Sequence, residues 1–176
     1  AHRGYPLRYP ENTLPGIAAA LGCGARYVEV DVQLTADGVP VLFHDATLER
    51  LCGVPGAIAG HGLAALSRLS PGAPHYFGGR YADLVIPTLR ELVALWRDWP
   101  QATLFVEVKA EALARFGIGP VHRAVSEILE PIQERAVLIS FDLDLLAAVR
   151  GIGWPALGAV VERWSNLEDP RIAPLS

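Results

Sequence analysis

Methionine is absent from the 176 residues, and lysine occurs once, at Lys109, against 14 arginines. The missing methionine leads us to expect that other residues precede Ala1 in the protein. Because lysine and arginine are not chemically interchangeable, a single lysine in a chain that otherwise uses arginine marks position 109 as a candidate functional residue.

Cysteine is nearly as scarce as lysine in this chain. Cys23 and Cys52 form neither a CxxC pair nor the spacing of zinc ligands, which argues against a zinc site and against a disulfide framework. Two ordinary thiols suit a reducing compartment. We therefore expect a cytoplasmic protein, with a removed N-terminal signal as the alternative.

Long apolar runs and basic clusters are also missing from the sequence. No stretch approaches the ~18 apolar residues of a membrane helix, and a net charge of −4 without a Lys/Arg-rich run offers nucleic acid no basic face. The hydrophobic content of 51% and the charged content of 19% are typical of a globular chain. The expected partner is a small molecule, with no nucleic acid and no integral membrane segment.

Residues 26–45 predict two strands joined by a tight turn. In the first strand Glu29 and Asp31 project to the same face, roughly 6.5 Å apart by the rise per residue. The valines that flank them, and the apolar run that leads to His44, are typical of strands buried on both sides. Buried carboxylates need a partner or a metal. From these residues alone, a cation site and a solvated strand face both stay open.

The remainder of the chain alternates short apolar strands with amphipathic helices, which predicts a parallel α/β sheet. Helices are expected from about Leu14, after the Thr88–Glu91 capping box, over Pro120–Leu129 and over Leu143–Arg150. Further strands are expected at Ala102–Lys109, Ala136–Phe141 and Leu157–Val161. Residues 46–86 are rich in glycine and proline, and they predict a long loop insertion with at most one helical turn near Leu63–Leu69.

Several carboxylates lie at the C-terminal ends of the predicted strands, which is the edge where α/β folds place their active sites. Three of them offer oxygen ligands of the kind that Mg²⁺ or Ca²⁺ prefers: Glu29, Asp31 and Glu107. No cysteine lies close to them in the sequence to favour zinc.

Histidines and cationic side chains are predicted to share this edge. His2 and His44 can serve as general acid and base beside a cation. Arg3 and Lys109 add positive charge that suits an anionic substrate, for which phosphate is the obvious candidate. Each element alone is a weak signal, and the joint pattern is much more specific.

The chain resembles the glycerophosphodiester phosphodiesterase family over about residues 1–165. The motifs that carry the resemblance are, in order, His2-Arg3-Gly4, Pro10-Glu11-Asn12-Thr13, Glu29-Val30-Asp31, Thr35-Ala36-Asp37-Gly38, His44-Asp45, Pro87-Thr88-Leu89 and Glu107-Val108-Lys109. The resemblance implies an α/β fold, a TIM (β/α)₈ barrel of the phospholipase C-like phosphodiesterase type. About six strands can be counted, so we expect residues 1–176 to form a single, partial catalytic domain that lacks the last two strand–helix units and carries the insertion at about 46–86.

The resemblance also implies an activity, the metal-dependent hydrolysis of glycerophosphodiesters to sn-glycerol 3-phosphate and an alcohol. Carried over to the matching positions, the metal ligands would be Glu29, Asp31 and Glu107, the acid/base pair His2 and His44, and the phosphate-binding residues Arg3 and Lys109. The cofactor would be a divalent metal, Mg²⁺ or Ca²⁺. The attacking hydroxyl is either the glycerol's own, through a cyclic phosphate, or that of water, and which histidine is the acid stays open.

Two alternatives remain beside this prediction, together with one expectation about assembly. An apolar groove built by residues 46–86 would favour a lysophospholipase D activity on substrates that carry an acyl chain. An incomplete barrel would favour a non-catalytic module that binds a phosphate ligand. It would also expose a sheet edge, which favours pairing with another chain in a homo-oligomer.

Overall fold

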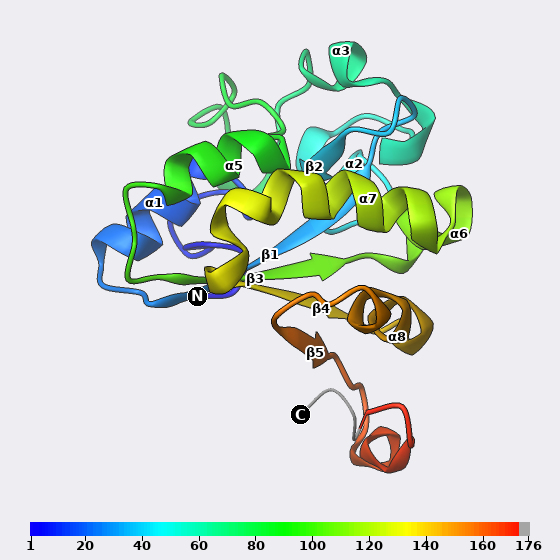
Figure 1. Ribbon diagram of the computed structural model, residues 1–176. Helices are drawn as coiled ribbons and strands as arrows, with labels where there is room; N and C mark the ends of the chain where they lie inside the picture. The colour runs from blue at the N-terminus through cyan, green and yellow to red at the C-terminus, as the bar shows by residue number, and fades with distance from the viewer. Residues whose placement is uncertain (173–176) are drawn as a thin grey trace.

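The computed structural model describes residues 1–172 of the chain. Five strands form one sheet in the order β2-β1-β3-β4-β5 (Figure 1). The strands are β1 (Tyr27–Leu34), β2 (Pro40–Leu42), β3 (Thr103–Val108), β4 (Ala136–Ser140) and β5 (Leu157–Ala159). β2 returns antiparallel to β1 as a hairpin, and the other three pairs are parallel. His2 adds a parallel bridge to Glu29 at the N-terminal end of the chain.

The larger helices form one layer outside the sheet, in which α1 contacts α5, α5 contacts α7 and α7 contacts α8 (Figure 1). They are α1 (Leu14–Gly22), α5 (Leu89–Trp96), α6 (Ala110–Phe116), α7 (Ile118–Leu129) and α8 (Leu143–Gly151). The 3₁₀ helix η2 (Glu130–Arg135) follows α7, and the 3₁₀ helix η3 (Trp164–Glu168) lies beyond β5, apart from this layer (Figure 1). Parallel strands with helices on one side are the arrangement of a TIM-type barrel. Within residues 1–172 the sheet stays open, and none of the helices is long and apolar enough to cross a membrane.

Apolar and polar side chains alternate along β1, so one face of this strand is apolar and the other is polar. Val28, Val30 and Val32 are completely buried in the main hydrophobic core, against the helix layer. The predicted capping box of α5 is present, because the Thr88 hydroxyl accepts from the Glu91 amide while the Glu91 carboxylate accepts from the Thr88 amide. The strand and helix positions predicted for these segments are therefore confirmed, and the polar residues of β1 are left to the opposite face.

Residues 46–86 are more ordered than the sequence predicts. They contain α2 (Glu49–Cys52), η1 (Ile58–Gly60), α3 (Leu63–Leu66) and α4 (Pro74–Phe77). Their apolar side chains form a second buried cluster with those of β2: Val41, Phe43, Leu48, Leu51, Ile58, Leu66, Ala73 and Ile86. The prediction of at most one helical turn was wrong, since helices of three or four residues are too short to leave a periodic pattern in the sequence.

Gly4 allows the N-terminal segment to lie against the start of α1. Its φ is +88°, and a Cβ atom at this position would stand 2.9 Å from the backbone carbon of Gly16. Both the backbone conformation and the close approach therefore require glycine. Because Arg3 precedes Gly4, this contact also fixes the backbone position of Arg3.

We predict that Gly4→Ala lowers the free energy of unfolding by about 1–3 kcal/mol, because the added methyl combines a clash with an unfavourable φ. Gly22→Ala is the matched control, since a Cβ there meets nothing within 4 Å and φ lies outside the positive range. Thermal denaturation of both variants measures the difference. A Gly4→Ala protein as stable as Gly22→Ala would contradict the packing described for this turn.

Candidate active site

Three carboxylates meet where β1 and β3 run side by side. The parallel register sets Asp31 opposite Glu107 and Glu29 opposite Phe105. One carboxylate oxygen from each of the three acidic residues lies within 4.8 Å of the others. Asp31 is completely buried, and Glu107 is 8% exposed. The two strands thus hold three acidic groups together in a place with little access to water.

This cluster has the character of a cation site. Burial, together with the charges of Asp31 and Glu107, raises the pKa of Glu29 to about 7. Oε1 of Glu29 and Oδ1 of Asp31 are buried without a hydrogen bond. Unsatisfied oxygens on mutually repelling carboxylates, with no sulfur or nitrogen ligand in the group, fit a hard divalent cation.

Two cationic side chains partly compensate the three carboxylates. Nζ of Lys109 lies 2.7 Å from Oε1 of Glu107 and 3.4 Å from Oδ1 of Asp31. Nε of Arg3 lies 3.1 Å from Oδ2 of Asp31. The pKa of Lys109 is raised, because its bonds to the carboxylates outweigh the opposing effect of burial. Asp31 is therefore held between the only lysine of the chain and an arginine from the N-terminal segment.

The backbone around Arg3 is held in an uncommon conformation. Arg3 and Asn12 have φ of 54° and 55°, in the left-handed region that side chains other than glycine seldom adopt. The Arg3 amide donates to the Glu29 carbonyl, and the Asn12 amide donates to the Arg3 carbonyl. Asn12 also exchanges two side-chain hydrogen bonds with Asp31, of 2.9 and 3.1 Å. Local strain is thus retained where the N-terminal segment meets the acidic cluster.

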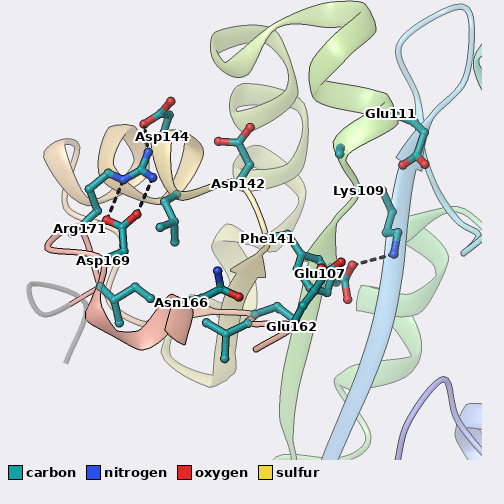
Figure 2. A pocket seen from close by; sticks show the side chains of 15 residues that line it. Glu107, Lys109, Glu111, Phe141, Asp142, Asp144, Glu162, Asn166, Asp169 and Arg171 are labelled. Atoms are coloured by element: carbon teal, nitrogen blue, oxygen red, sulfur yellow. Dashed lines mark hydrogen bonds and ion pairs between the residues drawn. The ribbon is translucent and has the colours of Figure 1, made fainter. Parts of the chain in front are cut away.

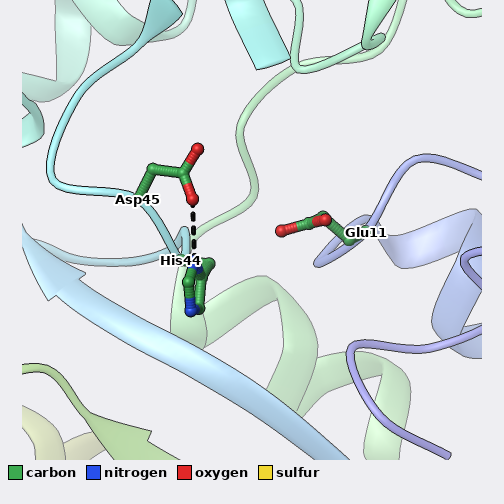
Figure 3. Close-up of side chains that lie close together, drawn as sticks. All are labelled: Glu11, His44 and Asp45. Atoms are coloured by element: carbon green, nitrogen blue, oxygen red, sulfur yellow. Dashed lines mark hydrogen bonds and ion pairs between the residues drawn. The ribbon is translucent and has the colours of Figure 1, made fainter. Parts of the chain in front are cut away.

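The two histidines approach the cluster from different segments. Nε2 of His2 lies 3.7 Å from Oε2 of Glu29, and burial together with the charge of Arg3 lowers the pKa of His2. His44 follows β2, and its Nδ1 lies 2.7 Å from Oδ1 of Asp45 (Figure 3). The buried Gln33 side chain donates to the carbonyls of residues 43–45 and so fixes the segment that carries His44.

A second acidic group lies beside His44, where Glu11 points toward the His44–Asp45 pair from the opposite loop (Figure 3). The guanidinium of Arg50 occupies the space between these carboxylates and donates two hydrogen bonds to each. This group already has its compensating charge, and it therefore offers a metal ion much less than the cluster on β1 and β3 does.

A cavity of about 650 Å³ opens beside the cluster (Figure 2). Glu107 and Lys109 line one end of it, and Arg171 lies between Asp144 and Asp169 at the other (Figure 2). The wall between these ends includes Phe141, Asp142, Glu162 and Asn166. Its size is that of a small-molecule site, and most of its charged lining is acidic.

The structure brings six of the seven predicted site residues into one continuous set of contacts: His2, Arg3, Glu29, Asp31, Glu107 and Lys109. His44 joins them through Asp45, Arg50 and Glu11, since Glu11 also accepts from Nη1 of Arg3 at 3.1 Å. Sequence reasoning missed Gln33 and Arg50. Arg50 left no signal, because its partner Glu11 is 39 residues away and the surrounding segment has no periodicity.

Comparisons with known proteins all match this chain to one family. Residues 2–153 match the family model described as the glycerophosphoryl diester phosphodiesterase family. Over 112 residues the chain is 40% identical to glycerophosphodiester phosphodiesterase 1 of Homo sapiens, an alignment that covers 64% of this chain and 34% of that protein. Over 171 residues it is 32% identical to the glycerophosphodiester phosphodiesterase of Caldanaerobacter subterraneus subsp. tengcongensis, covering 93% and 68%. The chain spans about a third of the length of the mammalian relatives that it matches.

Solved structures show the same similarity. A phosphodiesterase of Oleispira antarctica, in complex with the product sn-glycerol-3-phosphate, is 31% identical with a TM-score of 0.78, covering 96% of this chain and 69% of that one. The glycerophosphodiester phosphodiesterase of Thermotoga maritima is 26% identical with a TM-score of 0.71, covering 98% and 69%. Both resemblances extend over nearly the whole described chain.

We predict that Glu29→Gln stabilises the metal-free protein at neutral and higher pH. The fold raises the pKa of Glu29 from 4.5 to about 7, so this group favours the folded state fully below about pH 4.5, and that contribution is lost as the pH rises through 7. The variant should gain at most on the order of 3 kcal/mol at pH 8 and nothing at pH 4.

Urea denaturation in the presence of a chelator at the two pH values measures this difference. The exposed Glu134→Gln is the control, and its stability should follow that of the wild type. Added Mg²⁺ or Ca²⁺ should raise the melting temperature of the wild type more than that of Glu29→Gln. Equal stability of wild type and Glu29→Gln at pH 8 would show that the carboxylates do not repel one another as described.

Proposed function

The chain belongs to the glycerophosphoryl diester phosphodiesterase family, and from this membership we propose that it hydrolyses glycerophosphodiesters to sn-glycerol 3-phosphate and an alcohol with the help of a divalent metal, Mg²⁺ or Ca²⁺. One observation carries the proposal. Three clustered carboxylates, two of which have a buried oxygen without a hydrogen bond, lie beside two cationic side chains, and His2 approaches Glu29. Each of these groups has a function in the cleavage of a phosphodiester.

Glu29, Asp31 and Glu107 would hold the metal. When bound, the cation would neutralise these carboxylates and polarise a phosphoryl oxygen. Arg3 and Lys109 carry positive charge beside the same cluster, where they would bind the remaining phosphate oxygens and orient the diester. Lys109 suits this role because a flexible ammonium group can exchange a carboxylate partner for a phosphate oxygen.

His2 and His44 would move the protons. The neutral imidazole of one histidine takes the proton from the attacking hydroxyl as its oxygen forms a bond to phosphorus. The protonated imidazole of the other gives a proton to the alcohol oxygen as its bond to phosphorus breaks. They come from two different segments, the N-terminal segment and the segment after β2, which suits two histidines that serve opposite ends of the phosphodiester.

The cavity beside Glu107 and Lys109 would receive the substrate group that lies beyond the phosphate. Its acidic residues disfavour an anionic group there, and they suit a neutral or cationic alcohol such as choline or ethanolamine. The apolar residues of the insertion pack against one another in the second hydrophobic cluster. This packing favours small, water-soluble diesters over the acyl-bearing substrates of a lysophospholipase D.

We expect the protein to release sn-glycerol 3-phosphate from glycerophosphocholine and a chelator to abolish this activity. His44→Ala should lower kcat by about 10²–10⁴-fold, the usual contribution of a positioned acid or base. The exposed His75→Ala is the control and should leave the rate unchanged. Ligand binding without turnover in the wild-type protein would instead identify a non-catalytic phosphate-binding module.

We also expect glycerophosphocholine to be hydrolysed at least about tenfold more efficiently than lysophosphatidylcholine, because the apolar side chains of the second hydrophobic cluster are buried against one another and offer no surface to an acyl chain. Parallel measurements of kcat/KM below the critical micelle concentration compare the two substrates. A preference for the acyl-bearing substrate would contradict the proposed substrate class and support the lysophospholipase D activity.

A further inference from the structure

Arg50 connects the insertion to the histidine that precedes it. Its side chain extends from α2 and donates through Nε and Nη2 to the two oxygens of Asp45, the second bond being 2.8 Å long. It also donates through Nη1 and Nη2 to the two oxygens of Glu11, at 2.8 and 2.7 Å. One guanidinium therefore binds two carboxylates in a bidentate manner, and the planar fork of arginine is the side chain best suited to this arrangement.

The ion pair keeps Asp45 in its charged form. The hydrogen bonds from Arg50 lower the pKa of Asp45 to about 2, against the opposing effect of burial. Asp45 is thus a carboxylate at neutral pH, and a carboxylate can only accept hydrogen bonds. In the 2.7 Å contact between Nδ1 of His44 and Asp45, the proton must lie on Nδ1.

This constraint determines which nitrogen of His44 is available for chemistry. A neutral imidazole carries one proton, so a proton fixed on Nδ1 leaves the lone pair on Nε2. The orientation of the ring is fixed at the same time. Removal of Arg50 would leave the Asp45 carboxylate without its compensating charge and free to rotate away from Nδ1 of the ring.

We propose that Arg50 is a positioning residue for the phosphodiesterase reaction, and that it acts through Asp45 to hold His44 in the Nδ1-protonated form. This inference rests on the proposed function of His44. A second connection runs through Glu11, which accepts from both Arg50 and Arg3 and so joins His44 to the phosphate-binding side of the site. Residues 46–86 thereby supply a residue that supports the site.

The packing of α2 against the second hydrophobic cluster helps to position Arg50. Leu51, the neighbour of Arg50, is 2% exposed and packs in the second hydrophobic cluster. Gly53 ends the helix in a left-handed conformation and donates to the carbonyl of Glu49. The backbone that follows Arg50 is therefore anchored, and this fixes the point from which its long side chain reaches the two carboxylates.

The first test reads the state of the ring directly. Long-range ¹H–¹⁵N correlation NMR of ¹⁵N-labelled, metal-free protein distinguishes the two neutral tautomers, with the His44 signals assigned from a His44→Gln variant. We expect the wild type to show His44 with its proton on Nδ1. In Arg50→Ala we expect a mixture with a substantial Nε2-protonated fraction, and in the exposed control Arg68→Ala we expect the wild-type pattern.

Steady-state kinetics form the second test. Arg50→Ala should lower kcat for glycerophosphocholine by about 10–100-fold, the usual effect of removing a supporting partner. Arg50→Lys should recover only part of this loss, because an ammonium group cannot bind two carboxylates in a bidentate manner. Millimolar guanidinium chloride should partly rescue Arg50→Ala and leave His44→Ala unchanged.

The two tests separate this inference from the proposed function. A wild-type protein that hydrolyses no glycerophosphodiester would overturn the proposed function, while the NMR comparison would still decide whether Arg50 holds the tautomer. An unchanged His44 tautomer in Arg50→Ala would overturn the inference even if the activity fell. Should Arg50→Ala fail to fold, Arg50→Lys provides the same NMR comparison, and a wild-type tautomer pattern with unaltered kcat in that variant would count against it.

Discussion

Repulsion among three carboxylates held out of water is the constraint on which the rest of the site depends. Neighbouring strands bring Glu29, Asp31 and Glu107 together through backbone register, so the sheet itself fixes the positions from which the three acidic side chains extend. Arg3 and Lys109 supply two positive charges for three negative ones, and the remaining negative charge favours an added cation. The segments around the cluster contribute the cationic side chains and the histidines of the site.

Much of this arrangement could be predicted from the sequence, because it follows from periodicity. A spacing of two residues places Glu29 and Asp31 on one face of a strand, and the valines between them show which face is apolar. The same spacing at the end of β3 places Glu107 and the residue that follows the strand, Lys109, on a common face. Parallel strands then bring these side chains to one edge of the sheet, so two short motifs 76 residues apart indicate a single site.

The connections around this cluster could not be predicted in the same way. The contact between Arg50 and Glu11 joins two segments that are irregular in sequence, and no pattern relates them. Gln33 gave no signal either, since a polar residue on the inner face of a strand is equally compatible with solvent exposure. The short helices of residues 46–86 owe their form to the second hydrophobic cluster rather than to local propensity, which has little influence over four residues. Tertiary contacts decide these features, and a sequence records them only indirectly.

The division of β2 between two hydrophobic cores has a consequence for where the chain can tolerate changes in length. Val41 packs in the cluster of the insertion, while Leu42 packs in the main core, and His44 follows two residues later. Because side chains alternate along a strand, one residue added to or removed from the turn before Pro40 would exchange these two environments and turn the histidine to the other side. Length variation in this fold is therefore better tolerated in the loops beyond α2, the helix that carries Arg50, whereas the hairpin turn that precedes β2 must keep its number of residues.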